Sequence, residues 1–209
     1  MNRYKLGGWL IAGLLLCSCE EDHDPMPAYQ QRLAELTTDV SGKGVSLSFD
    51  DGEVRQIQNS VSGLVSDTVY RILALYIENG NSVQLQAARS VISPLPIEAN
   101  KIEIKTDPLE LKALWRAPRY INFLVGVHTG GGEHTLGFIN HGVESLPNGV
   151  NKLKLEVFHD QMDDTSFYTQ ETYLSCPLYP FAERLTAGKD SVEIKVQTWK
   201  GSITQSYLY

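Results

Sequence analysis

Apolar and polar side chains alternate with a period of two in many short segments of this chain, and this alternation restricts the fold more than any other feature. Val45, Leu47 and Phe49 alternate with serines, the pattern of a strand that is buried on one face. The chain is therefore predicted to be all-β. The same alternation recurs at 83–87, 121–127, 153–157 and 192–196.

The segment 28–93 is predicted to form a small OB-like β-barrel domain. Strands are expected at 53–58, at 69–78, which is apolar on both faces and hence central, and at 82–92. The opening strand is placed within 31–40, where the alternation is weakest. With the strand that ends at Phe49, these make about five short strands, a number that suits a small barrel.

The prolines of Ser93-Pro94-Leu95-Pro96 interrupt the strand pattern, because proline cannot donate to a ladder, and they mark a domain junction. Asp107 followed by Pro108 and Glu110 has the order of a helix start, which predicts a short helix that ends near Trp115. The rest of 97–209 returns to alternating strands and predicts an antiparallel β-sandwich domain.

The first 18 residues have the layout of an export signal, with Arg3 and Lys5 before an apolar stretch too short to cross a bilayer. Leu16-Cys17-Ser18-Cys19 resembles a lipobox, in which the last cysteine receives the lipid after cleavage. Two or more acyl chains at about 0.8 kcal/mol per methylene hold a domain on a membrane. An ordinary signal peptide or a short membrane anchor, with Cys19 as a bystander, is the alternative.

Residues 19–27 are rich in acids and contain two prolines, so they are predicted to form an extended, solvated tether. Acids directly behind the cysteine resemble the surface-export signal of Bacteroidetes lipoproteins. The expected location is the cell envelope, with the chain lipid-anchored at the outer membrane, on its surface or its periplasmic face.

Loss of Arg3 and Lys5 on cleavage changes 18 basic and 25 acidic residues to 16 and 25, a net charge of −9. Such an excess of acids argues against a nucleic-acid partner, which is bound through many Lys and Arg contacts. Cys176 is then the only cysteine besides Cys19, so no intramolecular disulfide is expected. Because its neighbours are apolar, Cys176 is predicted to be a buried, inert thiol.

Five segments in order after the lipobox resemble the NigD-like lipoproteins of Bacteroidetes. That resemblance implies an N-terminal OB-like barrel, a C-terminal β-sandwich and an accessory or immunity role associated with bacteriocins, and it brings no catalytic residues. The segments are Ser48–Gly52, Tyr70–Tyr76, Val127–Gly131, Leu155–His159 with Asp163-Asp164, and Lys195–Gly201.

The histidines of the sandwich region raise the question of a metal site. His128 and His134 flank a glycine turn beside Glu133, but a metal needs three or four ligands that converge on one point. His134 and His141 are an odd number of residues apart, so a regular strand directs them to opposite faces. Surface or turn histidines are the preferred interpretation of these three and of His159, and no metal or other cofactor is expected.

Two further motifs are interpreted as turns. Thr129-Gly130-Gly131-Gly132 lacks the Gly-Lys-Ser/Thr ending of a phosphate loop. The acids Asp50 and Asp51, and the group Asp160, Asp163 and Asp164, lack the spacing of an EF-hand and are interpreted as solvated turns. No hydrolase motif is found, so the chain is not expected to be an enzyme.

The function predicted from the sequence is that of a membrane-anchored, non-catalytic binding or accessory module with a protein or peptide partner. A glycan-binding accessory lipoprotein is the alternative, because exposed aromatic rings stack on sugars. A cryptic hydrolase that uses the histidines and acids ranks last. The aromatic candidates are Tyr70, Tyr76, Trp115, Tyr168 and Trp199.

Overall fold

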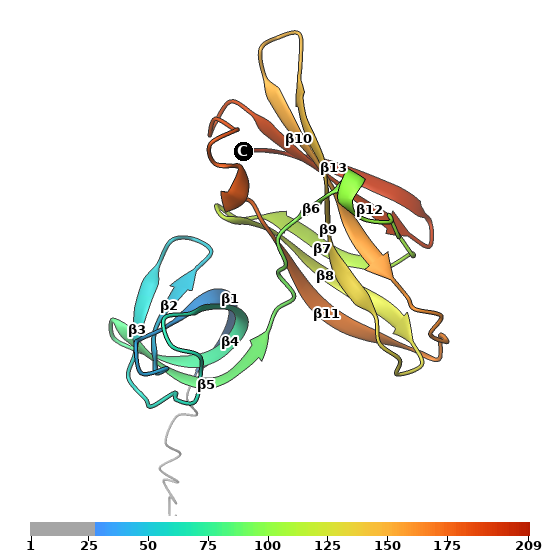
Figure 1. Cartoon of the computed structure of the whole chain (residues 1–209). Helices are drawn as coiled ribbons and strands as arrows, with labels where there is room; N and C mark the ends of the chain where they lie inside the picture. The colour runs from blue at the N-terminus through green and yellow to red at the C-terminus, as the bar shows by residue number, and fades with distance from the viewer. Residues whose placement is uncertain (1–27) are drawn as a thin grey trace, which may run out of the picture.

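The computed structural model describes residues 28–209 and shows two all-β parts, a closed barrel and a two-layer sandwich (Figure 1). The predicted fold class, a small OB-like barrel followed by a β-sandwich, is confirmed. The signal segment, the tether and Cys19 lie outside the described residues. Among the residues that are described, no helix is long and apolar enough to cross a membrane.

The barrel closes five strands in the order β1-β2-β3-β5-β4. Its interior is apolar, with Leu47 and Tyr76 completely buried and Phe49 packed against Tyr76 at a centroid distance of 5.2 Å. The strands are β1 (Tyr29–Thr38), β2 (Gly44–Phe49), β3 (Val54–Ile57), β4 (Val69–Asn79) and β5 (Ser82–Ser90).

The sandwich packs a five-stranded sheet, β13-β12-β10-β9-β6, on a three-stranded sheet, β11-β8-β7. Inward side chains of both sheets make one core, in which Phe123 stacks on Phe138 at 5.8 Å. The strands are β6 (Ile97–Glu98), β7 (Glu110–Arg116), β8 (Tyr120–Thr129), β9 (Thr135–Ser145), β10 (Asn151–Asp160), β11 (Tyr168–Pro177), β12 (Ser191–Thr198) and β13 (Gly201–Leu208).

Two details of the sandwich differ from the prediction. The expected helix after Asp107 is wrong, because 110–116 is strand β7 and the only helical turns described are the 3-10 turns η1 (Ala99–Lys101) and η2 (Tyr179–Phe181). Leu109 is buried and β7 pairs along its length with β8, so tertiary pairing overrides the local helix-start signal. The five-stranded sheet is also mixed rather than antiparallel, because β10 pairs parallel to β12 and β6 parallel to β9.

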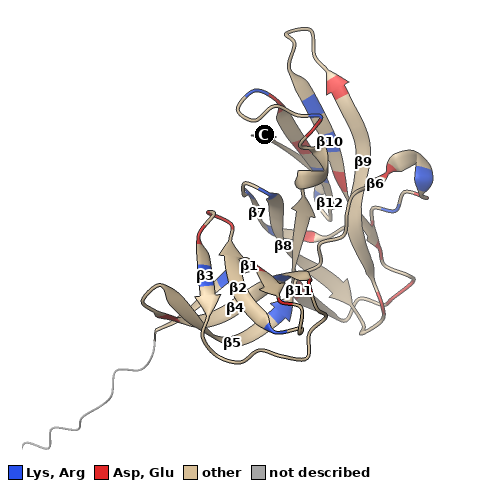
Figure 2. Cartoon of the chain, turned by 60° about the vertical axis from the view of Figure 1, so that its left-hand side comes forward, with Lys and Arg blue, Asp and Glu red and all other residues tan. Residues whose placement is uncertain are grey.

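The barrel and the sandwich meet along β1, β4 and β11 and are joined through residues 91–96. Leu33, Leu73 and Val91 on the outside of the barrel form a small buried cluster against Trp115 and Tyr173 of the sandwich. Lys and Arg positions are spread over both parts among acidic ones (Figure 2).

Candidate functional site

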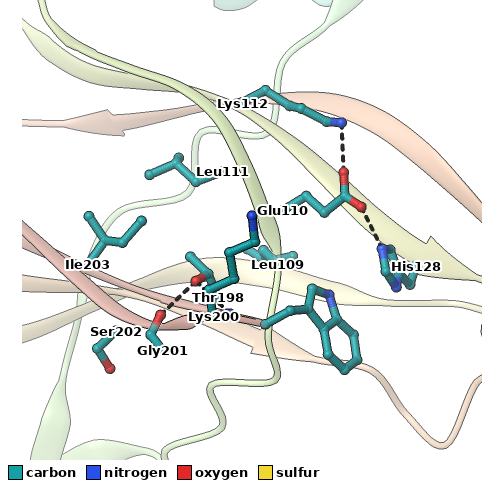
Figure 3. Close-up of a pocket in the computed structure, with 11 residues that line it drawn as sticks. Leu109, Glu110, Leu111, Lys112, His128, Thr198, Lys200, Gly201, Ser202 and Ile203 are labelled. Atoms are coloured by element: carbon teal, nitrogen blue, oxygen red, sulfur yellow. Dashed lines mark hydrogen bonds and ion pairs between the residues drawn. The ribbon is translucent and has the colours of Figure 1, made fainter.

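A groove with a volume of about 480 Å³ lies between the start of β7 and the turn that joins β12 to β13 (Figure 3). The groove lies there because Leu109 pairs with Thr198. This bridge brings the start of β7, in the smaller sheet, against the end of β12, in the larger sheet. The residues that line it are Leu109, Glu110, Leu111, Lys112, His128, Thr198, Trp199, Lys200, Gly201, Ser202 and Ile203.

Trp199 is the main exposed aromatic residue of this groove, with 51% of its surface exposed. Its ring stacks on His128 with a centroid distance of 4.9 Å and an interplanar angle of 19°. Trp199 occupies a two-residue turn between the paired residues Thr198 and Gly201, and the Thr198 hydroxyl donates to the Gly201 carbonyl at 2.6 Å. The indole is therefore held on one face by His128.

Glu110 links His128 and Lys112 along the wall of the groove. Its carboxylate lies 2.9 Å from His128 Nε2 and 2.6 Å from Lys112 Nζ (Figure 3). Hydrogen bonds from His128 and then Lys112 lower the pKa of Glu110 to about 2. Glu110 is therefore ionised at neutral pH and already accepts two donors, which suits a recognition surface better than proton transfer.

A second polar group, at the same end of the sandwich as the groove, consists of His134, His159 and Asp164. His134 Nδ1 lies 2.8 Å from His159 Nε2, and His134 Nε2 lies 3.1 Å from Asp164 Oδ2. His159 is buried, and its Nδ1 lies 2.9 Å from the carbonyl oxygen of Asp107. Because a carbonyl oxygen only accepts, His159 Nδ1 donates to Asp107. In neutral His159 the other ring nitrogen, Nε2, then accepts from His134.

The glycine turn at 129–132 donates hydrogen bonds to the side chain of Asp164. Asp164 Oδ2 accepts hydrogen bonds from Thr129 Oγ1 at 2.5 Å, from the amide of Gly130 at 2.8 Å and from the amide of Gly132 at 3.1 Å. The bond from Thr129 is the main reason that the pKa of Asp164 lies far below its ordinary value. These amides hold a carboxylate of the chain itself, so the segment is a turn.

The histidines are distributed over separate places. His128 pairs with Glu110, and His134 lies with His159, whereas His141 Nε2 contacts Glu156 Oε2 at 2.8 Å. Within 28–209 no three His, Cys, Asp or Glu side chains are placed to hold a metal ion. The interpretation of His159 as a surface or turn residue is wrong, because its side chain is buried and contacts His134, just before β9, and Asp107, before β7.

Arg71 of β4 is the centre of a buried polar network across the two parts, which the sequence did not reveal as a site. Its guanidinium pairs with Asp50 at 2.8 Å, donates to Ser175 Oγ and Asn122 Oδ1 at 3.1 Å each, and lies over the ring of Tyr120. The signal in the sequence was the pair of family-like segments that contain Asp50 and Arg71.

The interpretation of Asp50 and Asp164 as solvated turn acids is therefore wrong. The side chain of Asp50 is 22% exposed and that of Asp164 is 9% exposed, because each accepts bonds from another part of the chain. Asp51 does lie at an exposed turn, where it pairs with Arg32 at 2.5 Å.

The exposure of the remaining candidates, the aromatic residues and Cys176, shows which of them could contact a ligand. Tyr76 is completely buried and Tyr70 and Trp115 are partly buried, while Tyr168 and Trp199 are exposed. Cys176 is free and fully buried, which confirms the predicted burial, and burial raises the pKa of its thiol well above the ordinary value.

These features define an all-β protein of two parts, with a polar network that joins them and an aromatic groove at one sheet edge. A family model described as the NigD-like C-terminal beta sandwich domain matches residues 92–209, more than half of the chain. The chain therefore belongs to the NigD-like family. The search of curated proteins found no match.

Solved structures share the fold over most of the chain. A NigD-like immunity protein from Bacteroides caccae is 21% identical, with a TM-score of 0.68 over 87% of this chain and 98% of its own. A protein named as toxin-related, from Parabacteroides distasonis, is 16% identical, with a TM-score of 0.69 over 87% and 93%. A protein named as a lipoprotein, from Bacteroides fragilis, is 11% identical, with a TM-score of 0.61 over 86% and 96%.

Proposed function

We propose that this chain is a lipid-anchored, non-catalytic binding module of the cell envelope, with an immunity-like role against a protein partner. Membership of the NigD-like family carries the proposal, and the immunity protein and the toxin-related protein that share its fold support it. The ionised, doubly paired Glu110 and the buried Cys176 are in keeping with a binding role.

The anchor is the thiol of Cys19 in the lipobox-like segment, and the acidic tether behind it carries the folded body from 28 onward. A Cys19→Ser chain is expected to escape lipidation and to leave the membrane fraction. Cys17→Ser is the matched control, because Cys17 precedes the cleavage point. Unchanged processing and membrane fractionation of Cys19→Ser would contradict the anchored model.

The protective role is tested by deletion of the gene, followed by survival counts in mixed culture with strains that secrete antibacterial proteins. The expected result is a loss of survival that the unchanged chain restores and Cys19→Ser does not. Equal survival of the deletion strain and its parent in every co-culture argues against an immunity-like role.

The groove beside Trp199 is the surface proposed to contact the partner. Trp199 and Tyr168 are exposed to similar extents, 51% and 53%, but only Trp199 lines the groove. Truncation of a hot-spot residue, a class in which Trp is enriched, costs about 2 kcal/mol or more of binding energy, so Trp199→Ala is expected to lose the partner in detergent pull-downs, whereas Tyr168→Ala retains it. Equal loss or equal retention by the two variants would remove the groove from the proposal.

Glycan binding is the second candidate function, and the geometry of Trp199 favours it. An indole with one face on His128 and polar groups of Glu110 and Lys112 nearby resembles the combination of a flat ring and hydrogen-bonding groups that binds sugars. Titration with soluble polysaccharides, followed by tryptophan fluorescence, tests it. A response that persists in Trp199→Ala would place any glycan site elsewhere.

A further inference from the structure

The last strand, β13, is an edge strand with an unusual surface. It pairs on one side only, with β12. Seven of its eight residues, all except Tyr207, are exposed, although they alternate between both faces of the sheet. Its sequence, Gly-Ser-Ile-Thr-Gln-Ser-Tyr-Leu, contains no charge and no proline, two of the devices that protect a natural sheet edge from pairing.

The free main-chain groups of β13 follow from its register. Tyr209 donates its amide to the carbonyl of Asp190 at 2.8 Å, and in an antiparallel ladder the bonded residues alternate with the unbonded ones. Tyr207, Gln205 and Ile203 therefore bond to β12. The amides and carbonyls that point away from β12 belong to Ser202, Thr204, Ser206 and Leu208.

The larger sheet also extends beyond the smaller one at this edge. Ile203 pairs with Val196 and shares its core-facing side, yet Val196 is completely buried and Ile203 is 42% exposed. The cause is that the smaller sheet has three strands against five and ends at β7, whose contacts are with β12. A strand position beside β13 is therefore open and partly apolar.

The other sheet edges of the sandwich are protected within the described residues. Strand β7 carries Lys112 and Arg116, and the Tyr207 hydroxyl donates to its Leu114 carbonyl at 3.3 Å. Strand β6 has two residues. The second half of strand β11 is covered by the junction, where Ile92 bridges to Leu174, and its exposed first half carries Glu171.

We propose that β13 pairs antiparallel with β13 of a second copy of this chain, so that the two five-stranded sheets form one continuous sheet. A two-fold axis at Gln205 aligns all the free groups: Ser202 faces Leu208 of the partner subunit, and Thr204 faces Ser206 of the partner subunit. It also places Ile203 opposite the partner subunit's Tyr207, an aromatic and β-branched pair that stabilises sheets.

A second copy fits this edge better than a foreign strand because of charge. In a two-fold pairing both opposed strands have the same sequence, so β13 must be compatible with itself, and β13 has no charged side chain that could bring like charges together. Recognition of a different protein generally uses complementary charges, and β13 offers none. Pairing of single edge strands buries less than a standard interface of roughly 1,600 Å², so we expect a dissociation constant of roughly 1–100 μM.

Analytical ultracentrifugation of the mature chain with Cys19→Ser tests the proposal over a range of about 1 to 500 μM, chosen to span that constant. The expected result is a monomer–dimer equilibrium. Thr204→Pro removes an amide that is free of β12 and is expected to weaken dimerisation at least about tenfold, whereas Thr204→Ala dimerises normally. A chain that stays monomeric at 500 μM, or a dimer that Thr204→Pro leaves unchanged, overturns the proposal.

Variants with opposite charges on β13 distinguish a loss of self-pairing from a general loss of folding. The double variant with Thr204→Lys and Ser206→Lys places like charges opposite each other in the dimer, and so does the double variant with Thr204→Glu and Ser206→Glu. Each is expected to be monomeric alone, with an unchanged circular dichroism spectrum, and a 1:1 mixture of the two is expected to dimerise. A mixture that remains monomeric overturns the proposed register.

Discussion

Arg71 in the barrel and Asn122 in the sandwich are 51 residues apart, and their side chains meet in a buried hydrogen bond of 3.1 Å between Nη2 and Oδ1. Asn122 Nδ2 in turn donates to Asp50 Oδ2 at 2.8 Å, the same oxygen that accepts from Arg71 at 2.8 Å. The side-chain amide of Asn122 in the sandwich therefore bonds to both members of the Arg71–Asp50 ion pair of the barrel. This contact couples the two parts.

Arg71→Met is expected to lower the free energy of unfolding by about 2–4 kcal/mol, because it leaves Asp50, Asn122 and Ser175 without their shared donor. Arg119→Met is the control: Arg119 also pairs across the junction, with Glu35 at 3.1 Å, but its side chain is 59% exposed, so a loss below about 1 kcal/mol is expected. Urea denaturation measures both. Equal losses would show that the buried network does not stabilise the junction.

The sequence predicted most strands because their two faces differ. Its weakest segment was β1, and the structure explains why. Leu33 points out of the barrel but is buried against Trp115 and Tyr173, so an apolar residue occupies a position that a solvated strand would fill with a polar one. The same cause makes β4 apolar on both faces at Leu73.

The sites were less predictable than the strands because they depend on distant pairs. His134 and His159 are 25 residues apart, and Arg71 and Ser175 are 104 apart, separations that no local spacing reveals. Trp199 is an exception, because an aromatic residue in a two-residue turn has little chance of burial. The helix prediction was wrong because it relied on a local signal. Asp107 has the sequence context of a helix cap, but its carboxylate accepts a long-range hydrogen bond from the amide of Gln161 at 2.7 Å.

Burial of His159 predicts a loss of stability in mild acid. Burial is the main cause that lowers the pKa of His159, and His134 adds to it. The unfolded chain binds a proton at this residue near pH 6.5, whereas the folded chain binds it only at lower pH. The contribution of neutral His159 to the free energy of unfolding is therefore present above about pH 6.5. It falls as the pH is lowered from there toward the folded pKa.

Urea denaturation at pH 7 and at pH 5 measures this effect. The unchanged chain is expected to lose more stability between the two pH values than His159→Gln, which keeps polar atoms but cannot be protonated. The loss in the unchanged chain should come before that of Asp164, whose contribution is lost only as the pH falls from about 4, the pKa of an unfolded Asp, toward its lowered folded pKa. An identical pH dependence of the two chains would contradict the assignment to His159.

Burial of Cys176 predicts chemical inertness. In the mature chain with Cys19→Ser it is the only thiol, and it is completely buried in the sandwich core. A maleimide is expected to label it in denaturant but at least about 100-fold more slowly in the folded chain at pH 7, since the reactive form is the thiolate. A Ser66→Cys variant, at an exposed position, is expected to react at its added thiol without denaturant. Fast labelling of folded Cys176 would show that the core opens.

The close fit of Gly132 against Asp164 predicts that a single methyl group disturbs the glycine turn. A Cβ added at Gly132 would lie 2.7 Å from Asp164 Cγ, closer than unbonded carbons approach, and the carboxylate must then move away from the amides and from His134. Gly132→Ala is expected to cost about 1–3 kcal/mol, the usual range for an overpacked site. Gly137→Ala is the control, because its Cβ would meet Pro94 Cγ at an ordinary 3.7 Å. If urea denaturation gives the two variants the same stability, the turn does not hold Asp164 rigidly.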